Sequence, residues 1–122
     1  MKKKYLLIAI PVIILSCYYD NEERLYPDAG GDCDTTEISF QYNIKPILST
    51  YCYACHSNKN SPSFGNNIHL EDYKDVINMS ERMVGALNHE PLFVPMPRNG
   101  NKLNDCLILK FEAWLDQGSQ DN

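Results

Sequence analysis

The sequence predicts a small all-α domain with long loops. Two segments, 40–51 and 107–115, carry apolar side chains at helical spacing, and no stretch of strand length alternates between apolar and polar residues. The chain has 122 residues, of which 43% are hydrophobic and 22% charged, which is typical of one globular domain. Five cysteines are many for this length, and their odd number means that they cannot all pair with one another.

The first 16 residues are predicted to be an export signal that does not belong to the folded domain. Three lysines precede an apolar run over residues 5–15, which covers only about half a bilayer. The following Ile14-Leu15-Ser16-Cys17 resembles the lipobox of bacterial lipoproteins. This resemblance implies that the signal peptide, residues 1–16, is removed and that Cys17 is acylated, so that two or three acyl chains anchor the protein to a membrane. The alternative is an ordinary cleaved signal followed by an unmodified cysteine.

Residues 17–32 are expected to form the acylated N-terminus and a flexible tether, since Pro27 and Gly30-Gly31 disfavour regular structure. Asp after the lipidated cysteine holds enteric lipoproteins in the inner membrane, so Tyr18 favours the outer membrane, on its periplasmic or cell-surface face. Cleavage removes three of the eleven basic residues and none of the sixteen acidic ones, which leaves a net charge of −8. Such an acidic chain is not expected to bind nucleic acid.

The folded domain is predicted over residues 33–118, with 119–122 as a C-terminal tail. Its first helix is expected to begin after Ser39, a favourable N-cap, and to kink or lose a turn at Pro46. The apolar face of this helix consists of Phe40, Ile44, Ile47, Leu48 and Tyr51.

The last helix is predicted to begin after Asn104 and to end at Gly118. Its apolar face consists of Leu107, Ile108, Phe111, Trp114 and Leu115. Between the two helices, residues 57–67 are predicted to form a loop, and 71–79 and 80–87 two short helices. Three prolines and an Asn-Gly pair make 91–100 irregular.

The chemistry of the chain is concentrated in Cys52-Tyr53-Ala54-Cys55-His56, which has the C-x-x-C-H spacing of c-type haem attachment. Two thiols at this spacing, at the end of a helix, can form thioethers with the two haem vinyl groups. His56 can then ligate the iron. Covalent haem attachment takes place outside the cytoplasm, in agreement with the export signal.

The motif has three other interpretations. A thioredoxin-like redox pair would follow a strand, whereas a helix is predicted here. A structural zinc site would need a second close pair of Cys or His residues, but Cys33 and Cys106 are single and far apart. A disulfide between Cys52 and Cys55 would leave His56 without a role.

An electron carrier needs a sixth iron ligand in addition to His56. The candidates are His69, Met79, Met83, His89 and Met96. Met79 and Met83 lie at helical spacing and are expected in the core, and His69 at the surface or in a cap. Met96 lies between two prolines, and such a rigid loop holds a flexible thioether at little entropic cost. His89 is the second choice, and a Met96 packed in a turn is the alternative.

The two ends of the domain resemble small monohaem class I c-type cytochromes, in particular the lipoprotein members of Bacteroidetes and Planctomycetes. Phe40-x-x-x-Ile44-x-Pro46-Ile47-Leu48 before the motif resembles their entry helix. Met96-Pro97-x-Asn99-Gly100-x-x-Leu103-x-Asp105-Cys106-x-Ile108, continued to Gly118, resembles their methionine loop and last helix. The likeness covers nearly the whole domain and is loosest over 57–90.

This resemblance implies a cytochrome c-like fold, in which the first and last helices cross beside a covalently bound haem c. It implies thioethers at Cys52 and Cys55, and iron ligated by His56 and Met96 on opposite haem faces. The contacts of the haem propionates are left open. The candidates for them are Arg98, Lys102 and Trp114.

Cys33 and Cys106 are predicted to form a disulfide. Cys33 precedes the first helix and Cys106 lies in the first turn of the last, so the thiols can meet if these helices cross. Pairing is expected in an oxidising compartment. Closing this loop stabilises the fold by about 4 kcal/mol in the chain-entropy estimate. Two unpaired thiols are the alternative.

The function predicted from these features is electron transfer and not catalysis. With both axial positions filled, iron changes its redox state without binding a substrate. The acidic surface is expected to steer the protein to a basic face on a redox partner protein. Two alternatives remain: a haem enzyme or a gas or redox sensor with a labile sixth ligand, and a binding lipoprotein without haem.

Overall fold

The computed structural model describes residues 33–122, and this part of the chain is helical, with no strand. The predicted all-α class is therefore confirmed for the described residues. The predicted signal peptide 1–16, the lipidated Cys17 and the tether 17–32 lie outside them. None of the helices in 33–122 is long and apolar enough to cross a membrane.

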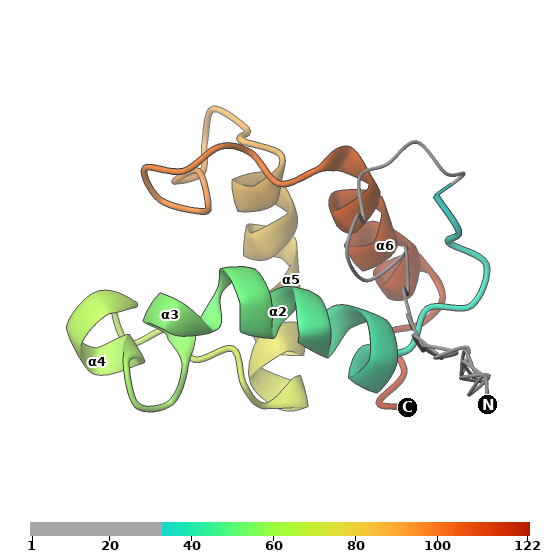
Figure 1. The fold of residues 1–122 in the computed structure, drawn as a ribbon, viewed down its shortest axis with the longest axis horizontal. Coiled ribbons are helices and arrows are strands. Elements are labelled where there is room, and N and C mark those ends of the chain that lie inside the picture. The colour runs from blue at the N-terminus through green and yellow to red at the C-terminus, as the bar shows by residue number, and fades with distance from the viewer. Residues whose placement is uncertain (1–32) are drawn as a thin grey trace, which may run out of the picture.

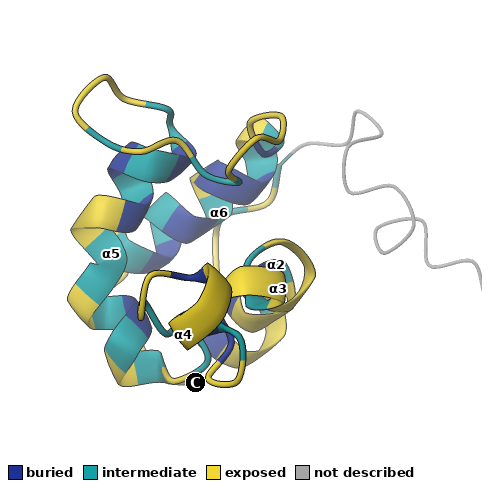
Figure 2. Cartoon of the chain, turned by 90° about the vertical axis from the view of Figure 1, so that its left-hand side faces the viewer, coloured by how far each residue is buried: buried dark blue, intermediate teal, exposed yellow. Residues whose placement is uncertain are grey.

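Six helical elements follow one another along the described chain (Figure 1). They are η1 (Phe40–Ile44), α2 (Lys45–Tyr51), α3 (Tyr53–His56), α4 (Ser61–Phe64), α5 (Tyr73–Leu87) and α6 (Asp105–Asp116). η1, α2 and α3 form one nearly continuous rod, with α5 and α6 beside it. Figure 2 shows that the buried residues face inward between these elements, while α3 and α4 are largely exposed.

The first helical segment begins with a π-helical turn, η1, and continues as α2. The hydroxyl of Ser39 accepts a hydrogen bond from the N–H of Tyr42 at 3.3 Å, so the predicted N-cap is confirmed. The N–H of Ile44 donates to the carbonyl of Ser39 at 3.2 Å, which is the wider π-helical spacing. Pro46 then lies in the first turn of α2, where a helix does not need its missing N–H. The irregularity expected at Pro46 is this change from π-helical to α-helical hydrogen bonding.

The predicted apolar face of this segment is buried except at its end. Phe40, Ile44 and Leu48 are at most 2% exposed, and Ile47 packs against the core. The prediction was wrong for Tyr51, which is 39% exposed. The reason is that α6 packs against η1, at the opposite end of the segment, so position 51 extends beyond the part that the last helix covers.

Aromatic side chains join the first and last helices. Trp114 of α6 is completely buried, and its ring centroid lies 5.4 Å from that of Phe40 and 5.7 Å from that of Phe111. Tyr73, at the start of α5, meets Phe40 edge to face at 5.3 Å. Aromatic pairs of this kind stabilise a fold beyond the burial of their area, so this cluster fixes η1, α5 and α6 against one another.

Both ends of α6 are capped as the sequence predicts. The side chain of Asn104 accepts a hydrogen bond from the N–H of Cys106 at 2.7 Å. At the other end the N–H of Ser119 donates to the carbonyl of Trp114, and that of Gly118 to the carbonyl of Leu115. This is a Schellman motif, which requires a residue with positive φ, and Gly118 supplies it at +92°.

Two predictions for the middle of the chain were wrong. The segments 71–79 and 80–87 form one helix, α5, because the hydroxyl of Ser80 donates to the carbonyl of Ile77 and so does not interrupt the backbone hydrogen bonds. The predicted loop 57–67 contains the short helix α4, with Pro62 in its first turn. Residues 91–100 contain no helix, as predicted.

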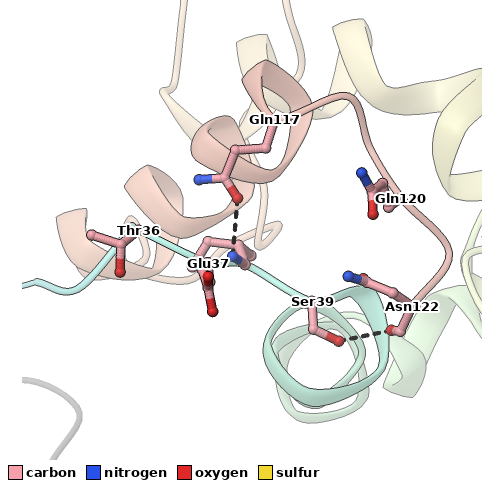
Figure 3. A pocket seen from close by; sticks show the side chains of 7 residues that line it. Thr36, Glu37, Ser39, Gln117, Gln120 and Asn122 are labelled. Carbon is pink, nitrogen blue, oxygen red and sulfur yellow. Dashed lines mark hydrogen bonds between the residues drawn. The ribbon is translucent and has the colours of Figure 1, made fainter.

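Residues 119–122, expected to form a tail, return to the start of η1. The backbone carbonyl of Asn122 accepts hydrogen bonds from the hydroxyl of Ser39 at 2.7 Å and from the N–H of Gln41 at 2.9 Å. A pocket of about 430 Å³ lies beside these contacts (Figure 3). It is lined by Thr36, Glu37, Ile38, Ser39, Gln117, Gln120 and Asn122. The side chains around it are mostly polar, and Gln117 and Asn122 hydrogen-bond the entry segment 36–40.

Candidate functional site

The C-x-x-C-H motif occupies the turn at which α2 passes into α3. Cys52 ends α2 and begins α3, and its N–H donates to the carbonyl of Leu48 at 2.8 Å. The carbonyl of Cys52 accepts hydrogen bonds from the N–H groups of Cys55 at 3.1 Å and His56 at 2.8 Å. A single helical turn therefore holds the three chemical groups of the motif at a fixed spacing.

The two thiols of the motif are free and differ in their surroundings. Cys52 packs against the core, and its burial raises the pKa of the thiol to about 11. Cys55 is exposed. The alternative disulfide between Cys52 and Cys55 is not formed in this structure.

The imidazole of His56 is held by one of its two nitrogens. Nδ1 lies 3.0 Å from the carbonyl oxygen of Ile68. A carbonyl can only accept, so Nδ1 carries the proton, and in the neutral ring the lone pair is on Nε2. The carbonyl of His56 also accepts a hydrogen bond from the N–H of Leu70 at 2.9 Å. Metal-ligating histidines usually have their second nitrogen bound in this manner, which fixes the tautomer and the ring orientation.

Gly65 closes the backbone around this histidine. A Cβ at this position would lie 2.5 Å from the carbonyl oxygen of Cys55 and 3.0 Å from Nδ1 of His56. The first distance is too short for a side chain and involves a backbone atom that cannot rotate away, so glycine lets the loop after α4 approach the motif this closely. Sequence reasoning missed Gly65 and Ile68. Glycine is common in loops, and the contact of Ile68 uses a backbone carbonyl, which leaves no signal in the residue type.

Met96 is half-buried in the loop between α5 and α6, and both of its backbone polar groups are paired. Its N–H donates to the carbonyl of Ala86 at 3.0 Å. Its carbonyl accepts a hydrogen bond from Nε2 of His89 at 3.1 Å. Figure 1 shows this loop above α3, on the side of the molecule away from the C-terminus. Met96 and the motif come from distant parts of the chain, the loop between α5 and α6 and the junction of α2 and α3.

The other candidate ligands have different surroundings. Met83 is buried and Met79 packs against the core, as expected of core methionines. His69 is half-buried beside the Ile68 contact. His89 uses its Nε2 to hold Met96, so this nitrogen is already occupied in the structure.

The three candidates for propionate contacts also differ. Arg98 is exposed, and the ammonium group of Lys102 pairs with the carboxylate of Asp105 at 3.1 Å on the surface. The indole N–H of Trp114 donates to the carbonyl of Gln120 at 3.0 Å, so this donor already has a partner within the fold.

Two buried hydroxyl groups near the motif have no hydrogen-bond partner among the described residues. They belong to Tyr53, inside the motif, and to Ser61, at the start of α4. Burial raises the pKa of Tyr53, and the negative charge of Glu71 adds to this effect. An unpaired buried hydroxyl costs about 1–3 kcal/mol, so these two groups are a local weakness of the protein chain by itself.

Cys33 and Cys106 form a disulfide, as predicted. Their Cα atoms lie 5.6 Å apart, and 73 positions separate them in the sequence. The bond joins the segment before η1 to the first turn of α6. It therefore fixes the two helices on which the core depends.

No family model, curated protein or solved structure matches this chain. Within residues 33–122, no three side chains of His, Cys, Asp and Glu come together in a group that could hold a metal ion.

Proposed function

We propose that this protein is an exported electron carrier with one covalently bound c-type haem in a cytochrome c-like fold. Cys52 and Cys55 would hold the haem through thioethers, and His56 and Met96 would ligate its iron. When bound, the haem supplies a one-electron couple between ferric and ferrous iron. Lipid on Cys17 anchors the chain to a bacterial membrane. Because residue 18 is Tyr and not Asp, the outer membrane is favoured.

The observation that carries this proposal is the state of His56 within the C-x-x-C-H motif. Its Nδ1–H donates to the carbonyl of Ile68, so Nε2 retains its lone pair for a metal. Both cysteines of the motif are free to react, while the other two described cysteines are paired. A thiol pair beside a histidine in the ligating tautomer is the donor set that covalent haem attachment requires.

The packing of the helices supports the fold part of the proposal. The entry segment η1–α2 leads directly into the motif, and its first residue, Phe40, packs on Trp114 of the last helix. The contact between first and last helices is the relationship that a cytochrome c-like fold requires. The two unpaired hydroxyls, Tyr53 and Ser61, also fit a site that a further group completes.

Electron transfer suits this site better than substrate chemistry because the Met96 backbone is held at both of its polar groups. A fixed loop would keep the Met96 thioether in one place in both redox states of a bound haem, which lowers the reorganisation that electron transfer requires. The acidic chain, with a net charge of −8 after signal cleavage, favours a redox partner with a basic docking face.

Haem staining of a denaturing gel tests the proposal. The exported wild-type protein is expected to give a coloured band that survives denaturation, because thioethers are covalent. The double variant Cys52→Ser/Cys55→Ser is expected to lose the band. The matched double variant Cys33→Ser/Cys106→Ser removes the same number of thiols and is expected to keep it. A wild-type protein without a coloured band would favour the haem-free lipoprotein.

The absorption spectrum tests the axial ligands separately. Ferric wild-type protein is expected to show the weak far-red band of sulfur–iron charge transfer, and Met96→Ala to lose it. A wild-type protein with high-spin ferric haem that binds CO rapidly would favour the enzyme or sensor.

A further inference from the structure

The loop that carries Met96 is attached to the C-terminal end of α5. His89 follows the helix directly and has a left-handed backbone, with φ of +57°. This conformation turns the chain back along the helix, and the N–H of Glu90 donates to the carbonyl of Gly85 at 2.9 Å. The loop therefore begins by folding onto the turn of α5 that it has just left.

Side-chain packing continues this attachment. A Cβ on Gly85 would lie 2.3 Å from the ring of Phe93, so this ring rests directly on the backbone of α5. At the start of the loop, the amide of Asn88 donates to the carboxylate of Glu112 at 2.7 Å, which ties the loop to α6 as well. The segment from Asn88 to Phe93 is thus fixed to both long helices before the chain reaches Met96.

The last contact is made at Met96 itself, from both sides. Its N–H donates to the carbonyl of Ala86, in the last turn of α5. Its carbonyl accepts from Nε2 of His89, whose ring bridges the beginning of the loop and Met96. Because a carbonyl cannot donate, Nε2 of His89 carries a proton and its lone pair is absent from this nitrogen. His89 acts here as a donor that holds the methionine backbone.

We propose that His89 is a positioning residue for Met96: by holding the Met96 carbonyl it keeps the thioether at the iron and excludes external ligands from the sixth position. This inference rests on the proposed haem function and goes beyond it, because it names the group that decides between a closed electron carrier and an open, ligand-binding site. The Ala86 contact fixes one side of the Met96 backbone and His89 the other, so loss of His89 leaves the backbone polar groups of Met96 held at one point.

The test compares three variants of the full-length, haem-loaded protein. His89→Leu removes the donor, and His89→Gln keeps an N–H at a similar distance from the backbone. Neither substitution adds a β-branch at the left-handed position, so the backbone cost is matched. Asn101→Leu, at an exposed position of the same loop, is the control for a polar residue replaced by leucine.

The measurement is the affinity of imidazole for the ferric protein, followed by loss of the far-red band. His89→Leu is expected to bind imidazole about tenfold more tightly than wild type, as the loss of one hydrogen bond predicts. The imidazole affinity of His89→Gln is expected to return most of the way to that of wild type. The affinity of Asn101→Leu is expected to equal that of wild type. Wild-type affinity in His89→Leu, or equal affinity in the Leu and Gln variants, would overturn the proposal.

Hydrogen exchange gives a readout that does not depend on the iron. The amide of Met96 is expected to exchange several-fold faster in His89→Leu, while the amides in the middle of α6 keep their wild-type rates. An unchanged Met96 amide would also overturn the proposal. The two failures are distinct. Wild-type protein without covalent haem refutes the proposed function, whereas loaded wild-type protein with an unresponsive His89→Leu variant refutes only the role of His89.

Discussion

Nδ1 of His56 lies 3.0 Å from the carbonyl oxygen of Ile68, and this contact joins the motif to the chain that follows α4. The motif would otherwise end in a short, exposed helical turn. The same segment binds the backbone of His56 through Leu70, so the side chain and the main chain of the histidine are held together. A ring fixed in this way needs little ordering when it ligates a metal, which favours tight and rapid ligation.

Gly65→Ala is expected to destabilise the fold by about 1–3 kcal/mol, because the added methyl group meets the carbonyl of Cys55 and the ring of His56. Its φ of −104° is allowed for alanine, so the cost is steric and does not come from the backbone conformation. Urea denaturation measures the change. Gly100→Ala is the matched control, since its Cβ would approach only Pro97 at an ordinary 3.4 Å, and it is expected to stay within about 0.5 kcal/mol of wild type. Equal effects of the two substitutions would contradict this account.

Phe40→Ala is expected to cost about 3–5 kcal/mol in the free energy of unfolding, because it removes a ring that is 1% exposed and joins Tyr73 to Trp114. Tyr42→Ala removes an aromatic ring from the same π-helical turn at a position that is 84% exposed, and its cost is expected to stay below about 0.5 kcal/mol. Denaturation followed by tryptophan fluorescence compares the two. A small effect at Phe40 would show that η1 is not part of the stabilising core.

Opening the Cys33–Cys106 disulfide is expected to lower the free energy of unfolding by about 4 kcal/mol, since the bond closes a long loop of the unfolded chain. Cys33→Ser/Cys106→Ser is the variant, and chemical denaturation of wild type and variant gives the difference. Alkylation of denatured, unreduced wild type followed by mass spectrometry checks the pairing itself. Two additional alkylated thiols in that protein would mean that the bond does not form in the cell.

Tyr53→Phe is expected to leave the free energy of unfolding at pH 7 unchanged or to raise it by up to about 1 kcal/mol. The reason is that it deletes a buried hydroxyl that has no partner in the described chain. This expectation holds for the haem-free protein. If the hydroxyl is satisfied by the haem, the same substitution destabilises the loaded protein. Denaturation of both forms separates the two cases.

The pH dependence of Tyr53 has a definite sign. Burial raises the pKa of this phenol above its ordinary value of about 10, so the unfolded state releases its proton first as the pH rises. Wild type therefore loses stability as the pH rises from about 10 through the higher folded pKa, and Tyr53→Phe lacks this loss. The difference between wild type and variant, measured at pH 8 and near pH 11, isolates Tyr53 from other groups. A difference that is constant with pH would refute the assignment.

Local signals in the sequence were sufficient for the start of the first helical segment, for both ends of the last helix and for most of the core. The caps at Ser39 and Asn104 use side chains within three residues of the N–H groups from which they accept, and the turn at Gly118 uses the positive φ that glycine adopts readily. Such contacts form in any helix that begins or ends at these residues. The apolar spacing likewise predicted Phe40 and Trp114 as core residues, and both are buried.

Local signals failed where contacts with residues distant in the sequence decide the length of a helix or the exposure of a side chain. A helix boundary was predicted between residues 79 and 80, but the hydroxyl of Ser80 is satisfied inside α5, and the burial of Val76 and Met83 on one face favours a continuous helix. Tyr51 fits the apolar spacing and is nevertheless exposed, because spacing shows which face a residue occupies and not how far the covering helix extends.

The sequence by itself determined the all-α class, the caps, the reactive motif and the cysteines that pair. Only the tertiary structure decided which groups hold the site: the carbonyl of Ile68 on His56, the absence of a Cβ at Gly65 and the hydrogen bond from His89 to Met96. The physical reason is that each of these contacts uses backbone atoms, which every residue carries. Residue identity therefore does not predict these contacts. They form only when the path of the chain brings the two contacting segments together.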